Sequence, residues 1–129
     1  MKEITISSIK AFISLNQLPF IPTQSKLSVP VVFRICQKIS HGIKFDDIKI
    51  CGNLIIDGHH RYLSAMMMGV EIGKVDSNAT SATKPIAWSH VEFDELDWDT
   101  PAKIAHLNKV DADYNQMEVE FITQITLAK

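Results

Sequence analysis

The chain has 129 residues, of which 46% are hydrophobic and 22% are charged, and its net charge at pH 7 is −2. This length fits one domain, residues 1–129, that buries a core, and the apolar runs of a few residues are far too short to span a membrane. The N-terminus lacks the apolar core of a signal peptide, and Cys36 and Cys51 are too few for a disulfide framework, so we expect a cytoplasmic protein with two buried thiols.

Charge is distributed unevenly along the chain. Residues 1–61 contain eight Lys/Arg and four Asp/Glu, a net charge of +4, whereas residues 62–129 contain five and eleven, a net charge of −6. Five of these acidic residues fall in "VEFDELDWD", residues 91–99. We therefore expect an anionic ligand on the side of the first half. A sequence pI of about 6.2 argues against a general nucleic-acid binder, which usually has a basic face and a high pI.

The N-terminal third is predicted to contain a strand, a loop and a helix. Ile4 and Ile6 alternate with polar residues, which is typical of a short strand. Residues 14–25 include two prolines among polar neighbours and are predicted to form a loop. An apolar stripe from about residue 29 or 30 to 41, followed by Gly42, predicts a helix with a glycine at its end.

The centre of the chain is predicted to form a hairpin and a helix. Gly52-Asn53 is a hairpin turn signal between two apolar runs, so strands are expected at about 47–51 and 54–57. Apolar residues then recur at the i, i+3, i+4 and i+7 spacing of an amphipathic helix, namely Leu63, Met66, Met67 and Val70. The sequence therefore predicts a helix over about 59–68 that ends at Gly69.

The second half of the chain carries weaker signals. The predicted elements are a strand within 70–75, a polar loop over 76–85, a strand over 86–93 and a helix from Thr100-Pro101 to about Tyr114. Residues 116–129 fit helical spacing and strand alternation equally well. We find no repeat and no boundary to a second domain.

The start of the helix at residue 59 has an unusual composition. His59, His60 and Arg61 occupy its first turn, where unpaired N–H groups and roughly half a positive charge favour acidic side chains. A bound anion would reverse this preference, and Gly58 would allow the backbone to approach it closely. Histidine suits such a site because it donates to phosphate and titrates near neutral pH. The alternative is a solvated helix start with neutral histidines.

The stretch "LIIDGHHRYLSAMMMG", residues 54–69, resembles the ParB/sulfiredoxin superfamily, most closely its ParB-like nuclease and free-serine-kinase forms. The resemblance extends more loosely over residues 28–75, and nothing specific is recognisable beyond about residue 76. It implies a small α+β domain with a mixed sheet, helices, and a nucleotide-phosphate site at the N-terminus of a helix.

Individual residues match the family unevenly. Gly58 and Arg61 match every form of the motif that we compared, and Asp57 matches the aspartate of the kinase-like form. His59 stands where sulfiredoxins have their cysteine, so sulfinic-acid reduction is not expected. His60 with Arg61 matches the paired arginines of partition proteins only in part, and the DNA-binding helices of those proteins are missing.

The first functional hypothesis is a nucleotide-binding domain. The resemblance implies that Gly58, His59, His60 and Arg61 hold the phosphates of a ligand such as ATP or CTP. Asp57 would hold a Mg²⁺ ion bridging those phosphates, and Asp57 and His60 are the candidate catalytic residues for phosphotransfer or phosphate hydrolysis. The alternative for Asp57 is a turn or capping role, which is common for an Asp-Gly pair.

Two further hypotheses remain open. A ParB-like nuclease or DNA-associated module would need a metal that activates water. His59 and His60 point about 100° apart on a helix and cannot both face one ion, so a further ligand would have to come from His90, His106 or the acidic region. A non-enzymatic protein would instead bind a partner through the acidic region 92–99 and its aromatic neighbours, which are Trp88, Phe93 and Trp98. Alternatively, these aromatic side chains complete the core.

Overall fold

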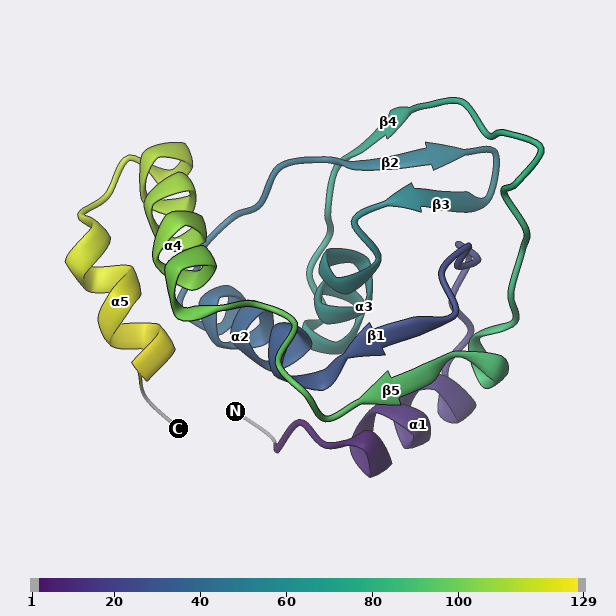
Figure 1. The fold of residues 1–129 in the computed structure, drawn as a ribbon, viewed down its shortest axis with the longest axis horizontal. Coiled ribbons are helices and arrows are strands. Elements are labelled where there is room, and N and C mark those ends of the chain that lie inside the picture. The colour runs from purple at the N-terminus through teal and green to yellow at the C-terminus, as the bar shows by residue number, and fades with distance from the viewer. Residues whose placement is uncertain (1–2, 128–129) are drawn as a thin grey trace.

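The computed structural model describes residues 3–127 (Figure 1). Their elements, in chain order, are α1 (Ile6–Leu15), β1 (Lys26–Ser28), α2 (Val29–Ser40), β2 (Ile48–Cys51), β3 (Leu54–Asp57), α3 (His59–Met68), β4 (Lys74–Asp76), a 3₁₀ turn η1 (Trp88–His90), β5 (Glu92–Asp94), α4 (Pro101–Asn115) and α5 (Val119–Leu127). Among the helices of this described part, none has the length and apolarity that crossing a bilayer requires.

The strands form two small sheets. In the first, β2 pairs with β3 in antiparallel fashion and with β4 in parallel, so the order is β3-β2-β4. In the second, β1 pairs with β5 in parallel, with Leu27 opposite Phe93. The pairing of β1 with β5 joins segments that are more than sixty residues apart. The fold is therefore a small α+β domain with a mixed sheet, as predicted.

The predictions for the centre of the chain are confirmed. The hairpin turns at Gly52-Asn53, and α3 begins at residue 59 and ends at Gly69, whose φ of +69° is the left-handed conformation of a glycine C-cap. The predicted helix at 29–41 is also present, and Gly42 follows it with a φ of +82°. In these segments the glycines and the apolar spacing predict the same turns and helix ends that the folded structure has.

The predicted strand at Ile4 and Ile6 is wrong, because this segment begins α1. Thr5 and Ser8 form a capping box, in which the Thr5 hydroxyl accepts from the Ser8 N–H at 3.0 Å and the Ser8 hydroxyl accepts from the Thr5 N–H at 2.8 Å. Ile9 then points into the core with no exposed surface. Two alternating isoleucines are too short a pattern to outweigh this cap.

Three other segments differ from or refine the predictions. The strand expected within 70–75 is β4, Lys74–Asp76, which covers only the last two of these residues and extends one residue further. The strand expected over 86–93 is instead the 3₁₀ turn η1 followed by β5. The ambiguous C-terminal segment is helical as α5, which buries Ile122 and Ile125; residues 128–129 of that segment lie outside the described residues.

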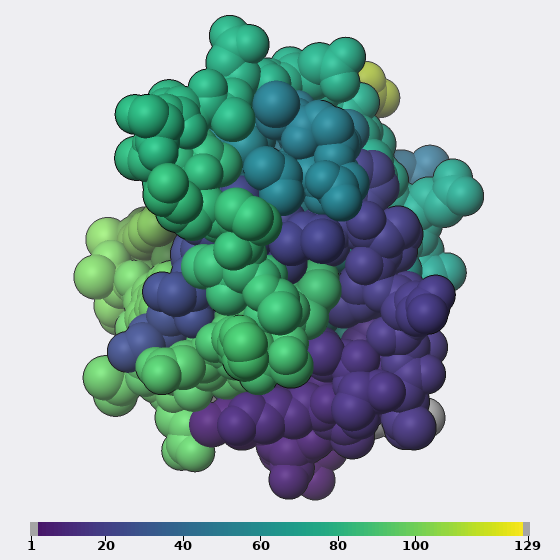
Figure 2. All heavy atoms as spheres, turned by 90° about the vertical axis from the view of Figure 1, so that its right-hand side faces the viewer, coloured from purple at the N-terminus to yellow at the C-terminus, as the bar shows by residue number. Residues whose placement is uncertain are grey.

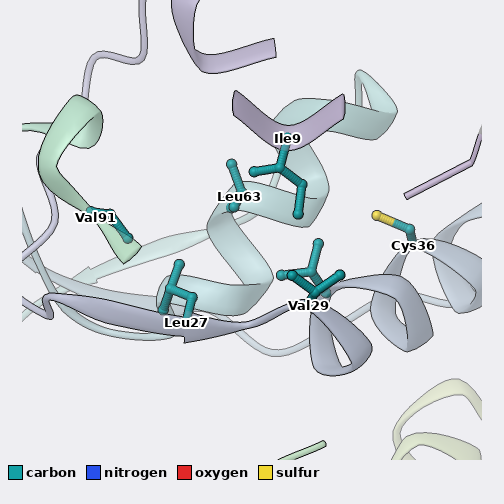
Figure 3. Packing of buried hydrophobic residues seen from close by; sticks show 7 residues of the cluster. Ile9, Leu27, Val29, Cys36, Leu63 and Val91 are labelled. Carbon is teal, nitrogen blue, oxygen red and sulfur yellow. The ribbon is translucent and has the colours of Figure 1, made fainter. Parts of the chain in front are cut away.

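The main core lies where α1, β1, α2 and α3 meet (Figure 3). Its buried residues are Ile9, Leu27, Val29, Val32, Cys36, Leu63 and Val91. A second cluster, Ile48, Ile55 and Tyr62, joins the hairpin to α3, and a third, Ile43, Ala112, Ile122 and Ile125, lies under α4 and α5. Burial raises the pKa of the Cys36 thiol to about 11, whereas Cys51 is only half-buried, contrary to expectation.

One face of the molecule is closed by the segment that leads into β5. Figure 2 shows α1 at the lower part of this face, the hairpin end of the sheet above, and the green segment between them. The Ile86 N–H donates to the Pro22 carbonyl at 2.9 Å, and the Trp88 indole N–H donates to the Phe20 carbonyl at 2.8 Å. These bonds hold the loop between α1 and β1 against the body of the fold.

Candidate functional site

A cleft of about 500 Å³ opens at the start of α3 and is lined by residues of α2, α3 and α4. All five residues singled out in the sequence line it, namely Asp57, Gly58, His59, His60 and Arg61. The cleft also contains Asp99 of the acidic region and five charged residues that the sequence did not single out, which are Arg34, Lys38, Asp46, Lys103 and Asp111. The predicted turn is therefore one wall of a larger site.

Gly58 is required at the turn between β3 and α3. Its φ is +93°, in the left-handed region that side chains disfavour. A Cβ at this position would lie 2.6 Å from Ile48 Cγ2 and 2.8 Å from Arg61 Nη2. Gly58 therefore allows the Arg61 side chain to fold back across the turn. It also leaves α3 without a side-chain cap, so the N–H groups of the first turn lack the acceptor that a capping residue supplies.

His59 is a buried, neutral side chain. Its Nε2 accepts a hydrogen bond from the Thr23 N–H at 3.0 Å, so its proton resides on Nδ1. Only 4% of the residue is exposed, and this burial lowers the pKa of the imidazole, an effect that the charge of Asp57 partly opposes. The Thr23 hydroxyl in turn donates to the Ile55 carbonyl at 2.6 Å. His59 thus fastens the loop before β1 to the start of α3.

His60 has the same arrangement one position further along. Its Nε2 accepts from the Ser28 N–H at 2.9 Å, and its ring lies edge-on to Trp98 with centroids 5.3 Å apart. Burial lowers the pKa of His60 to about 4, with a contribution from His59. The expectation that His60 titrates near neutral pH is therefore wrong. Because both histidines are uncharged at pH 7, neither opposes the helix dipole. His59 is buried and His60 is half-buried, so neither is a fully solvated side chain.

Arg61 is placed differently from the two histidines. Its Nη2 donates to the Asp47 carbonyl at 3.3 Å, and its buried Nε has no hydrogen-bond partner among residues 3–127. Within these residues Arg61 also has no carboxylate partner, whereas the other cations lining the cleft do. Its guanidinium therefore retains hydrogen-bonding capacity for an anion.

The opposite wall of the cleft, on α2 and α4, contains ion pairs as well as apolar side chains. Arg34 donates to both Asp97 oxygens at 2.6 and 2.7 Å and to Asp99 at 3.2 Å, and these bonds hold the pKa of Asp97 below its ordinary value. Lys38 pairs with Asp111 at 2.5 Å, and both residues are buried. Each of these pairs joins a cation of the first half of the chain to a carboxylate of the second half. The uneven charge of the two halves of the sequence is consistent with this pairing.

The aromatic residues of the acidic region have two different environments. Trp88 and Phe93 pack against the main core, as the alternative interpretation expected. Trp98 is 40% exposed and lines the cleft, and its indole N–H donates to Asp94 at 3.0 Å. Because Arg34 pairs with Asp97 and Asp99, part of the acidic charge is already neutralised within the fold.

The described residues contain no group of three or more His, Cys, Asp or Glu side chains arranged to hold a metal ion. His90 and His106 do not line the cleft. In His59 and His60, Nε2 is occupied by a backbone N–H and is not available as a metal ligand. The exposed carboxylate of Asp57 lies at the cleft and is the ligand of the predicted turn that a cation can reach.

Comparison with protein-family models, with curated proteins and with solved structures gives no match to the chain. The function is therefore inferred from the geometry of the cleft.

Proposed function

We propose that this protein is a domain of the ParB/sulfiredoxin type that binds a phosphate-bearing ligand, a nucleotide, at residues 57–61. The observation that carries the proposal is the combination of Arg61, a cation without a carboxylate partner in the described residues, with the uncapped N-terminus of α3 in one cleft. Both features favour negative charge at the same place.

The order of elements supports the family assignment. Helix α2, Gly42, the β2–β3 hairpin, the turn at Gly58 and helix α3 follow one another in the order that the resemblance implies. The residues of the turn line the cleft.

The donors at this turn suit phosphate oxygens, which only accept hydrogen bonds. The first-turn N–H groups of α3 and the Arg61 guanidinium are donors without acceptor capacity. In His59 and His60, Nε2 accepts from the backbone, so the other ring nitrogen carries the proton and is also a donor. Neutral histidines thus supply hydrogen bonds without the cost of burying two further charges.

Asp57 has the chemistry to hold Mg²⁺ together with the ligand. Mg²⁺ commonly binds through one or two carboxylates and the phosphates of its ligand, so a single exposed carboxylate beside the phosphate site is sufficient. The ion would neutralise phosphate charge during phosphotransfer or hydrolysis. His60 in this proposal holds a phosphate oxygen and does not act as a base, because its pKa lies far below neutrality.

Isothermal titration with ATP and CTP, with and without Mg²⁺, tests the proposal. We expect binding that strengthens with Mg²⁺ and weakens at least about tenfold in Arg61→Ala, since a charge-assisted hydrogen bond contributes roughly 1.5–3 kcal/mol. Lys109→Ala is the matched control, because it removes an equal charge from an exposed position of α4 that does not line the cleft. Equal binding by Arg61→Ala and the wild type, or no binding of either nucleotide to the wild type, would contradict the proposal.

A further inference from the structure

One face of α4 lines the cleft along most of its length. Lys103, Leu107, Val110 and Tyr114 follow one another at intervals of four, three and four residues, which places them in one row along the helix, and all four line the cleft. At 1.5 Å per residue, this row is about 16 Å long. The cleft is thus elongated along α4.

The row changes from charged to apolar along its length. At its start, the Lys103 ammonium pairs with Asp99 at 3.2 Å and lies near His60, where its charge adds to the effect of burial in lowering the pKa of the imidazole. This end therefore adjoins the phosphate site. Further along, Val110 is 46% exposed and Tyr114 is 53% exposed.

At two exposed positions, Val110 and Tyr114, α4 departs from the usual polarity of a surface helix. The buried side chains of α4 include the polar residues Asn108 and Asp111, whereas Val110 and Tyr114 are left open to the cleft. An amphipathic helix normally turns its apolar face to the core and its polar face to water. Apolar side chains exposed in a cleft beside a phosphate site point to a ligand that covers them.

A second aromatic residue joins the apolar end of the cleft. The Asn115 side chain accepts from the Lys44 N–H at 2.8 Å and donates to the Lys44 carbonyl at 2.9 Å. These two bonds fix the chain before β2 beside the end of α4. Phe45, which follows Lys44 and also lines the cleft, is thereby held in the neighbourhood of Tyr114.

We infer that the ligand lies lengthwise along α4, with its phosphates at the start of α3 and a flat ring system, a nucleobase, against Tyr114 and Phe45. This inference rests on the proposed function and adds where the non-phosphate part of the ligand binds. Stacking on an aromatic side chain suits any nucleobase, because every base has a flat π face. The apolar end of the cleft would contribute affinity, and the α3 end would select for phosphate.

Titrating ATP and pyrophosphate separates the two ends of the cleft. We expect Tyr114→Ala to weaken ATP binding about tenfold and to leave pyrophosphate binding unchanged, whereas Tyr114→Phe keeps the affinity for both. Because Tyr114 is exposed, the thermal unfolding of these variants should match the wild type and serves as the folding control.

The outcomes distinguish this inference from the proposed function. The inference would be overturned if Tyr114→Ala bound ATP as tightly as the wild type does, or if the wild type bound ATP and pyrophosphate equally well. Neither result would contradict the proposed phosphate site. Pyrophosphate and ATP affinities that are both insensitive to Arg61→Ala would overturn the proposed function instead. If the wild type binds none of ATP, CTP and pyrophosphate, both the inference and the proposed function are overturned.

Discussion

The two walls of the cleft use their charges in opposite ways. On the α2 and α4 wall, Arg34, Lys38 and Lys103 each pair with a carboxylate. On the α3 wall, Arg61 has only a backbone carbonyl at 3.3 Å as a partner among the described residues. Both walls contain cationic side chains, but among the described residues only the α3 wall has a guanidinium without a carboxylate partner. This guanidinium can therefore bind an anion.

The comparison shows that the number of cations in a cleft is a poor measure of its ability to bind anions. A paired cation helps to hold two elements together, and removing it leaves its partner uncompensated. An unpaired cation at an uncapped helix start contributes little to the fold and retains its capacity to bind. We therefore expect the two walls to respond differently to mutation.

Lys38→Ala should have the largest effect on stability. It leaves the Asp111 carboxylate without its partner at a site where both side chains are buried, so we expect a loss of about 3 to 5 kcal/mol in the free energy of unfolding, measured by urea denaturation. The double variant Lys38→Met with Asp111→Leu should recover most of this loss. A single variant as stable as the wild type would show that the pair does not hold α4 to α2.

Stability should also fall as the pH decreases from 6.5 to 4. The pKa of His60 is about 4 in the folded state, so between these values the unfolded chain binds a proton that the folded chain does not. The contribution of neutral His60 to stability is fully present above the pKa of the unfolded chain. At pH 4 the resulting loss in the free energy of unfolding should be on the order of 2 to 3 kcal/mol. Urea denaturation at several pH values measures it, and a flatter profile is expected for His60→Gln.

Gly58→Ala should destabilise the protein by about 2 kcal/mol. Its added Cβ meets Ile48 Cγ2 at 2.6 Å in a backbone conformation that alanine rarely adopts. The Arg61 guanidinium would also have to move, so nucleotide affinity should fall as well. The matched control is Gly42→Ala, which carries a similar positive φ but has nothing within 4 Å of the added atom, and which should leave binding unchanged.

Arg61→Ala should change the free energy of unfolding by less than about 1 kcal/mol, because this variant removes one weak hydrogen bond and, among residues 3–127, no ion pair. Thermal unfolding without ligand checks this expectation. A loss as large as that of Lys38→Ala would mean that Arg61 is part of the fold in the same way as the opposite wall, and the contrast between the walls would disappear.

The parts of the fold that the sequence predicts are those with strong local signals. The glycines at 52, 58 and 69 and the Thr100-Pro101 pair mark turns and helix ends whose conformations depend on a few neighbouring residues. The start of α1 was predicted wrongly because the strand pattern consisted of two isoleucines. The pairing of β1 with β5 has no local signal, since its partners are brought together only by the tertiary fold.

The same distinction applies to the site. The turn from Asp57 to Arg61 is contiguous in sequence, so its residues could be found together. The opposite wall joins Lys38 to Asp111 and Arg34 to Asp97, pairs separated by 73 and 63 positions, and only the overall charge imbalance hinted at them. The sequence offers neutral histidines only as solvated side chains. The bonds that hold them neutral within the fold have no local signal, because Thr23 and Ser28 donate their N–H groups from distant segments.

A ¹⁵N-edited NMR titration with pyrophosphate tests the central claim most directly, because it reports on the N–H groups that are proposed to bind phosphate. The structure predicts that the amide signals of residues 58–61 shift more than any others, and that these shifts are lost in Arg61→Ala. The absence of shifts at these residues, or larger shifts elsewhere in the molecule, would contradict a phosphate site at the start of α3.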